Sequence, residues 1–179
     1  MQPTEVLSFW FQEIKPQQQF ENSPDFDNLL RERFLAIHEK VSAGRTLDWR
    51  ITSGGRLAEI IVLDQFSRNM FRGTPAAFAS DTLALTLAKD AVATGADMKL
   101  PLEQRTFFYM PFMHSENKSD HEIAVKLFSQ PGLENGLRFE IAHKKIIDRF
   151  GRYPHRNKNL GRPSTIEEIE FLKENGSSF

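Results

Sequence analysis

The chain has 179 residues, with 23 Lys and Arg against 24 Asp and Glu, so its formal net charge is −1. With 40% hydrophobic and 26% charged residues it has the composition of an ordinary globular protein, and its length is that of one domain. The absence of Cys excludes disulfides, zinc ribbons, iron–sulfur clusters and thiol nucleophiles. We therefore predict a single domain over residues 1–179.

The N-terminal residues predict a short aromatic helix over residues 4–14. Val6, Trp10 and Ile14 recur there at helical spacing, and no basic segment precedes them, so the stretch does not resemble an export signal. No run of the chain reaches the ~18 apolar residues of a membrane span. The expected location is the cytoplasm, without a membrane interaction.

Seven further helices are expected, most of them between recognisable start and stop residues. Ser23 and Thr74 each stand before a proline, which is a typical helix start, and glycines such as Gly44 and Gly151 end the patterns. These helices are predicted at residues 24–43, 56–71, 75–94, from 101 onward, 121–130, 135–150 and from about 165 to Gly176.

Two local features interrupt this pattern. Leu47, Trp49 and Ile51 alternate with polar residues, which predicts a short extended arm near 47–51. Pro111 lies within the helix that begins near 101 and is expected to kink or break it, because proline removes a backbone hydrogen bond. The sequence predicts an all-α fold of about eight helices in stacked antiparallel pairs.

A first polar cluster lies in an otherwise apolar helix, in the segment LDQFSRNMFRG. Asp64 and Arg68 are four residues apart, as are Gln65 and Asn69, so each pair shares one side of the helix. One interpretation is an intrahelical ion pair with solvated amides. The other is a polar face directed into a pocket, where a buried arginine needs more than one partner.

A second cluster, FFYMPFMHSE, places His114 and Glu116 just after Pro111. Helix kinks expose backbone polar groups that often line sites, although a core kink followed by a helix-end histidine explains the same residues. Residues 120–122 add further acids and a histidine, but no metal-binding spacing is present, and we predict no metal site.

The third cluster, AHKKIIDRFGRYPHRN, is the most basic part of the chain. Residues 144–162 hold seven basic residues against one acidic residue, a net charge of +6, while the remainder carries −7. A proline-containing turn of arginine, histidine and asparagine suits carboxylate or phosphate recognition, although a solvated basic loop has the same composition. His143 lies on an apolar stripe, where a satisfied core histidine is the alternative.

These clusters resemble the signature blocks of a bacterial family called "domain of unknown function 924", grouped with the TPR-like helical superfamily. The similar segments are FWF (9–11), LDQFSRNMFRG (63–73), FYMPFMHSE (108–116), RFGRYPHRN (149–157) and LGRPSTIEEIEFL (160–172). The resemblance implies an all-α fold of helix pairs and no particular activity. Its motif positions fall on Asp64, Gln65, Arg68, Asn69, His114, Glu116, Arg149, Arg152, His155, Arg156 and Asn157.

The leading hypothesis is that the three clusters form one pocket for a small phosphorylated or carboxylated ligand. Its residues would be the motif positions together with His143. The alternatives are a TPR-like module that binds an acidic peptide, and a buried polar network that only fixes helix packing. Nucleic-acid binding is disfavoured by the acidic remainder of the chain. No cofactor motif is present, and whether the protein is an enzyme stays open.

Overall fold

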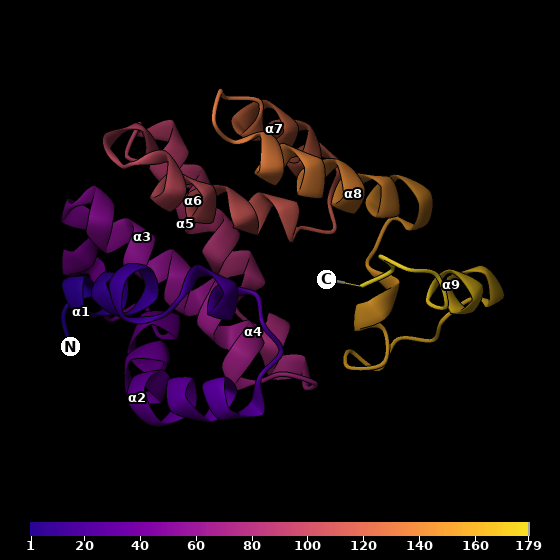
Figure 1. Cartoon of the computed structure of the whole chain (residues 1–179), viewed down its shortest axis with the longest axis horizontal. Coiled ribbons are helices and arrows are strands. Elements are labelled where there is room, and N and C mark those ends of the chain that lie inside the picture. The colour runs from indigo at the N-terminus through magenta and orange to yellow at the C-terminus, as the bar shows by residue number, and fades with distance from the viewer. Residues whose placement is uncertain (179) are drawn as a thin grey trace.

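The computed structural model describes residues 1–178, and over this range the chain is helical, without a strand. The predicted all-α class is confirmed. The first half contains α1 (Pro3–Ser8), α2 (Pro24–Ser42), α3 (Ser53–Ile61), α4 (Ser67–Met70) and α5 (Asp81–Ala93). The second half contains α6 (Leu102–Met113), α7 (Lys118–Phe128), α8 (Glu134–Phe150) and α9 (Ile166–Phe171) (Figure 1).

Two helices contain π-helical segments, which are rare in proteins. Residues Phe9–Glu13 continue α1, and residues Val62–Phe66 join α3 to α4 without a break. Because α3 and α4 form one continuous helical stretch, Ser53–Met70, we count them as one helix. The described residues then contain eight separate helices, in agreement with the predicted number. The TPR-like pairing of these helices stays a prediction.

The extended arm predicted near residues 47–51 is wrong, because Leu47–Ile51 form a 3-10 helix. The alternating apolar residues do not share a buried face: Trp49 is buried, whereas Leu47 is 64% and Ile51 is 85% exposed. No strand of residues 1–178 is available to pair with this segment. Its backbone bonds are local instead, from Trp49 N to the Thr46 carbonyl and from Thr52 N to the Trp49 carbonyl.

Several predicted helices differ from the structure, among them the one predicted at 56–71, which begins at Ser53, and the one predicted at 121–130, which is Lys118–Phe128. The stretch 75–94 is divided into a 3-10 turn, Pro75–Phe78, and α5, which places Asp81 at the first position of α5. Helix α6 continues through Pro111 without a break. The last helix begins as predicted, with Thr165 and Glu168 forming a capping box, but α9 ends at Phe171 rather than near Gly176.

The core of the helical body is built on aromatic rings from distant helices. The Phe9 ring lies 4.7 Å from the Phe34 ring, which lies 4.8 Å from Phe66, and Trp10 lies 5.5 Å from Phe66. All four side chains are fully buried. The two π-helical segments supply Phe9, Trp10 and Phe66, so the π-helical turns direct large side chains inward.

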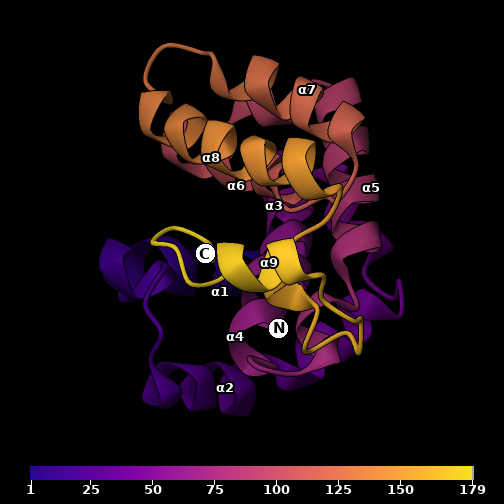
Figure 2. The ribbon, with the colours of Figure 1, turned by 90° about the vertical axis from the view of Figure 1, so that its right-hand side faces the viewer.

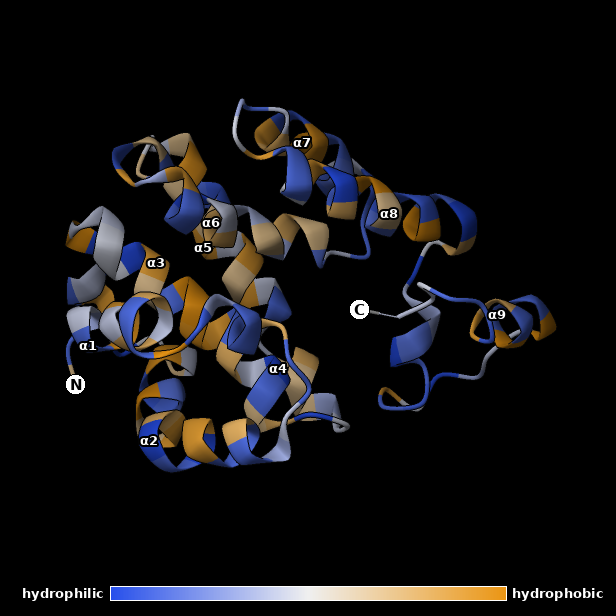
Figure 3. Cartoon of the chain, viewed as in Figure 1, coloured by the Kyte–Doolittle hydropathy of each residue, from blue (hydrophilic) through white to orange (hydrophobic). Residues whose placement is uncertain are grey.

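The chain after Gly151 forms a separate small structure beside the helical body. In the body, α5, α6, α7 and α8 each pack against the next, and α6, α7 and α8 lie together in Figure 2. Figure 3 shows α9 beyond the end of α8, with orange residues on its ribbon. A second hydrophobic cluster joins this segment to the end of α8 and consists of Ile146, Ile147, Tyr153 and Phe171, with Phe150 packed against it. The polar residues discussed below lie between this cluster and the main core.

A glycine at the start of α3 allows the 3-10 helix to pack closely. A Cβ atom on Gly55 would overlap the Trp49 carbonyl oxygen, whereas one on Gly54 would meet only the flexible Leu7 side chain at 3.3 Å. We expect Gly55→Ala to lower the free energy of unfolding by ~2 kcal/mol or more, as overpacking does. Gly54→Ala is the control and should change it by less than about 1 kcal/mol. Denaturant titration of both variants measures the difference, and equal effects would contradict it.

Candidate functional site

Asp64 lies in the π-helical segment that joins α3 to α4, and its carboxylate is 1% exposed. It accepts a hydrogen bond from His114 Nδ1 at 2.8 Å and from Gln65 Nε2 at 2.6 Å, and it pairs with Arg68 at 2.9 Å. Burial opposes ionisation, but Arg68 and His114 outweigh it and hold the pKa of Asp64 well below its ordinary range. Asp64 is therefore an ionised group that fixes the His114 ring.

Arg68 and Arg156 share the carboxylate of Asp81. Arg68 forms two bonds to it, at 3.0 and 3.1 Å, and Arg156 Nη1 forms one at 3.1 Å. Arg156 also donates to the His114 carbonyl at 2.9 Å, and its guanidinium lies over the rings of Phe78 and Tyr153. These contacts join α4, the start of α5 and the 3-10 turn Pro154–Arg156, which are distant in sequence.

Arg156 is the less compensated of the two arginines. Its side chain is buried, and burial together with the nearby Arg68 charge lowers its pKa below the ordinary value. For Arg68 the opposite holds: burial is outweighed by Asp64 and Asp81, which raise its pKa. The charge of Arg156 is thus less well stabilised by its surroundings than that of Arg68.

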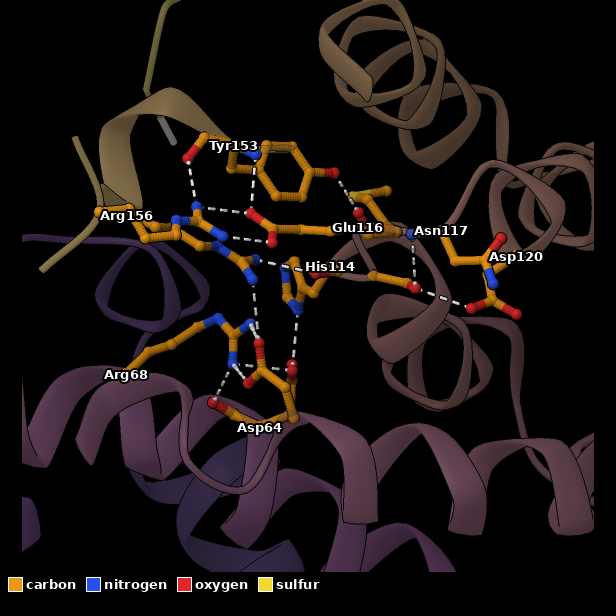
Figure 4. Close-up of polar contacts among 12 residues, drawn as sticks. Asp64, Arg68, His114, Glu116, Asn117, Asp120, Tyr153 and Arg156 are labelled. Carbon is orange, nitrogen blue, oxygen red and sulfur yellow. Dashed lines mark hydrogen bonds and ion pairs between the residues drawn. The ribbon is translucent and has the colours of Figure 1, made fainter. Parts of the chain in front are cut away.

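Glu116 fixes the backbone of the C-terminal segment beside this cluster. It accepts two bonds from Arg162, at 2.6 and 2.9 Å, and one from the Tyr153 backbone N–H at 2.8 Å. The Tyr153 hydroxyl donates to the Met113 carbonyl at 2.5 Å. Figure 4 shows Asp64 and Arg68 approaching from one side, Tyr153 and Arg156 from the other, with His114 between them.

Three histidines belong to the cluster and are held in the neutral form. Burial lowers the pKa of all three, and a nearby group adds to the effect in each case. Arg68 acts on His114, His114 acts on His143, whose pKa falls to about 3, and Arg156 acts on His155, whose pKa falls to about 4. The His114 and His143 rings are 6.2 Å apart, and both His143 and His155 lie against the Tyr153 ring, at 5.8 and 5.4 Å. His143 Nδ1 donates to the Phe139 carbonyl, as expected for a histidine on a buried helix face.

The structure brings together eight of the twelve predicted site residues. Those in or next to the cluster are Asp64, Gln65, Arg68, His114, Glu116, His143, His155 and Arg156. The other four bind elsewhere: Asn69 contacts Arg72, Arg149 pairs with Glu167, Arg152 with Glu168, and Asn157 with Ser164 and Arg162.

Sequence reasoning missed several residues that hold the cluster. Nothing in the sequence distinguishes Asp81 from an ordinary acidic residue in the first turn of a helix. Arg162 likewise could not be distinguished from the other arginines of the basic segment. His121 was considered only for metal binding, but its ring donates to the Ser115 carbonyl and lies 2.8 Å from Glu140 Oε1, both side chains being fully buried. Among residues 1–178, no group of three His, Asp or Glu is arranged to hold a metal ion.

The arginines of the basic segment are paired with acids from elsewhere in the chain. Arg149, Arg152 and Arg162 pair with Glu167, Glu168 and Glu116, and Lys144 pairs with Asp148. Its net charge of +6 therefore does not produce a broad free basic surface. Within the described part of the chain, no helix is both long and apolar enough to cross a membrane.

Comparison with known proteins agrees with this all-helical architecture. Residues 6–176 match the family described as "Bacterial protein of unknown function (DUF924)", and the chain belongs to this family. It is also similar to the solved structure of the protein of unknown function ATU0120 from Agrobacterium tumefaciens, with 35% identity over 97% of each chain and a TM-score of 0.92. No curated protein shows a significant match. The family resemblance seen in the sequence is confirmed.

The neutral histidines predict a stability change in mild acid. In the unfolded chain these histidines are protonated below their ordinary pKa of 6.5. In the folded chain the pKa of His143 is about 3 and that of His155 is about 4, so both stay neutral in this range. The free energy of unfolding should therefore fall as the pH is lowered from 6.5 towards 4. Denaturant titration between pH 7.5 and about 5 measures this loss before most carboxylates of the unfolded chain titrate.

His143→Gln provides the control for this measurement. It removes one of the two imidazoles whose pKa lies far below 6.5 in the folded chain, so the stability of the variant should depend less steeply on pH over the same range. A wild-type protein with the same stability at pH 7.5 and at about pH 5 would show that these imidazoles are not held neutral.

Proposed function

We propose that the chain binds a small anionic ligand, carrying a phosphate or carboxylate group, at the cluster of Arg68, Arg156 and the three neutral histidines. The observation that carries the proposal is the side chain of Arg156, which is 6% exposed and whose Nε has no hydrogen-bond partner. A buried charged donor without a partner is costly. An oxyanion is the partner that fits a guanidinium best, because it accepts two parallel bonds.

A second unpaired donor or acceptor lies on the neighbouring residue. His155 Nδ1 is buried and has no hydrogen-bond partner. Arg68 adds a guanidinium that keeps one fifth of its side chain exposed, and His114 keeps 16% exposed. The site therefore combines buried polar atoms that lack partners with groups that solvent reaches.

The proposed site is smaller than the one expected from the sequence. Arg149 and Arg152 are paired with Glu167 and Glu168 of α9, so we do not include these two arginines in the site. The matched charges of the basic segment favour a compact ligand over nucleic acid or an extended acidic peptide. We propose ligand binding at this site and no chemical reaction.

The second candidate is a purely structural polar network. It is favoured by the bonds that Glu116 makes to Arg162 and to the Tyr153 backbone, which fasten the C-terminal segment to the end of α6. Satisfied polar networks of this kind specify how helices pack. The two candidates differ in whether any small molecule stabilises the protein through Arg156.

A thermal-shift screen of phosphorylated and carboxylated metabolites tests the proposal. A ligand at about 100 times its Kd adds ~2.7 kcal/mol to stability, which raises the Tm of a chain of this size by several degrees. We expect such a hit with the wild type and its loss in Arg156→Gln. Arg149→Gln is the matched control, because it removes the same charge outside the cluster and should keep the hit.

Two results would contradict ligand binding at this site. One is a screen in which no compound raises the Tm of the wild type. The other is a hit that persists in both Arg156→Gln and His114→Ala. A large loss of stability in Arg156→Gln without any ligand response supports the structural network instead.

A further inference from the structure

The charges of the cluster are balanced before any ligand arrives. The guanidiniums of Arg68 and Arg156 face the carboxylates of Asp64 and Asp81, and the neighbouring Arg162 is paired with Glu116. A ligand anion therefore adds an uncompensated negative charge to a partly buried site. Such a charge is expensive unless a positive charge accompanies it.

The groups able to supply that positive charge are the imidazoles. A neutral histidine becomes a cation by taking one proton, and no other side chain of the cluster gains charge so close to neutral pH. The guanidiniums are already charged, and burial raises the pKa of Tyr153 far above its ordinary value. His155 has the best position, because it precedes Arg156 in the same 3-10 turn and its Nδ1 is buried without a partner.

We propose that the ligand anion binds together with one proton, which is taken from solvent by the imidazole of His155. This inference rests on the proposed anion site. The protonated ring carries N–H groups on both nitrogens, so Nδ1 is then a donor beside Arg156 whichever nitrogen held the proton before, and the new cation offsets the charge of the ligand. No covalent bond forms or breaks, and the proton is returned to solvent when the ligand leaves.

The surroundings of His155 explain why the proton is absent without the ligand. The charged and titratable groups that act on it come from several elements: Arg156 of its own turn, Arg68 of α4, Glu116 after α6, His114 at the end of α6, and His143 of α8. Burial and the two guanidiniums oppose protonation, and Glu116 favours it. An anion near Arg156 offsets the guanidiniums and so shifts the balance toward protonation.

Isothermal titration calorimetry with sulfate tests this coupling. Sulfate keeps the same charge from about pH 6 to 8, so any proton taken up belongs to the protein. Titrations are made in two buffers of different ionisation enthalpy, and the difference in heat gives the number of protons bound. We expect a net uptake of up to one proton per sulfate, largest at the lowest pH, and an affinity that rises by at most about tenfold for each unit of decreasing pH.

Two variants identify the group that takes the proton. His155→Gln should bind sulfate more weakly, with equal heats in the two buffers and a flat pH profile. His38→Gln is the matched control, because His38 is also a buried histidine but bonds Ser67 outside the cluster. It should keep both the proton uptake and the pH dependence of the wild type.

The outcomes separate this inference from the proposed function. Sulfate binding with equal heats in both buffers overturns the proton coupling and leaves the anion site intact. Proton uptake that persists in His155→Gln overturns the assignment to His155. Absence of sulfate binding to the wild type, together with a negative thermal-shift screen, overturns the anion site itself.

Discussion

The carboxylate of Asp81 is the contact on which the arrangement of the cluster depends. It holds the guanidiniums of Arg68 and Arg156 in one place, although these come from α4 and from the C-terminal segment. Without a shared anion, two like charges in a partly buried position would repel each other. Because His155 belongs to the 3-10 turn of Arg156 and Tyr153 directly precedes that turn, the Asp81 contact also helps to place these two rings.

Local parts of the fold and of the site could be predicted from the sequence. The Ser23 cap of α2 and the capping box of Thr165 and Glu168 depend only on residues within one turn. The pairing of Asp64 with Arg68 follows likewise from a spacing of four in a helix. The π-helical geometry that surrounds Asp64 has no comparable signal, because it depends on how the aromatic core accepts Phe66 and its neighbours.

The partners of the basic segment could not be predicted, because charge counted along the chain does not show which acids meet it in space. Glu116 lies 46 residues before Arg162, and Asp81 lies 75 residues before Arg156. Arg149 and Arg152 matched the expected anion site in residue type, yet α9 supplies acids to both. The prediction of an extended arm at 47–51 was wrong for a related reason: an alternating pattern forms a strand only where a second strand pairs with its backbone.

The two candidate functions differ in how they account for the unpaired atoms. The aromatic core and the small cluster around Tyr153 already bury the apolar side chains, and buried ion pairs add little net stability to such a fold. Buried atoms without a partner also occur outside the cluster, for example Trp10 Nε1 and Arg105 Nε, but the cluster has two on consecutive residues, His155 Nδ1 and Arg156 Nε, and each costs free energy. At the site that we propose, a ligand oxyanion would be the missing partner of such nitrogens. These two neighbouring atoms are the reason why we propose a binding site rather than a purely structural network.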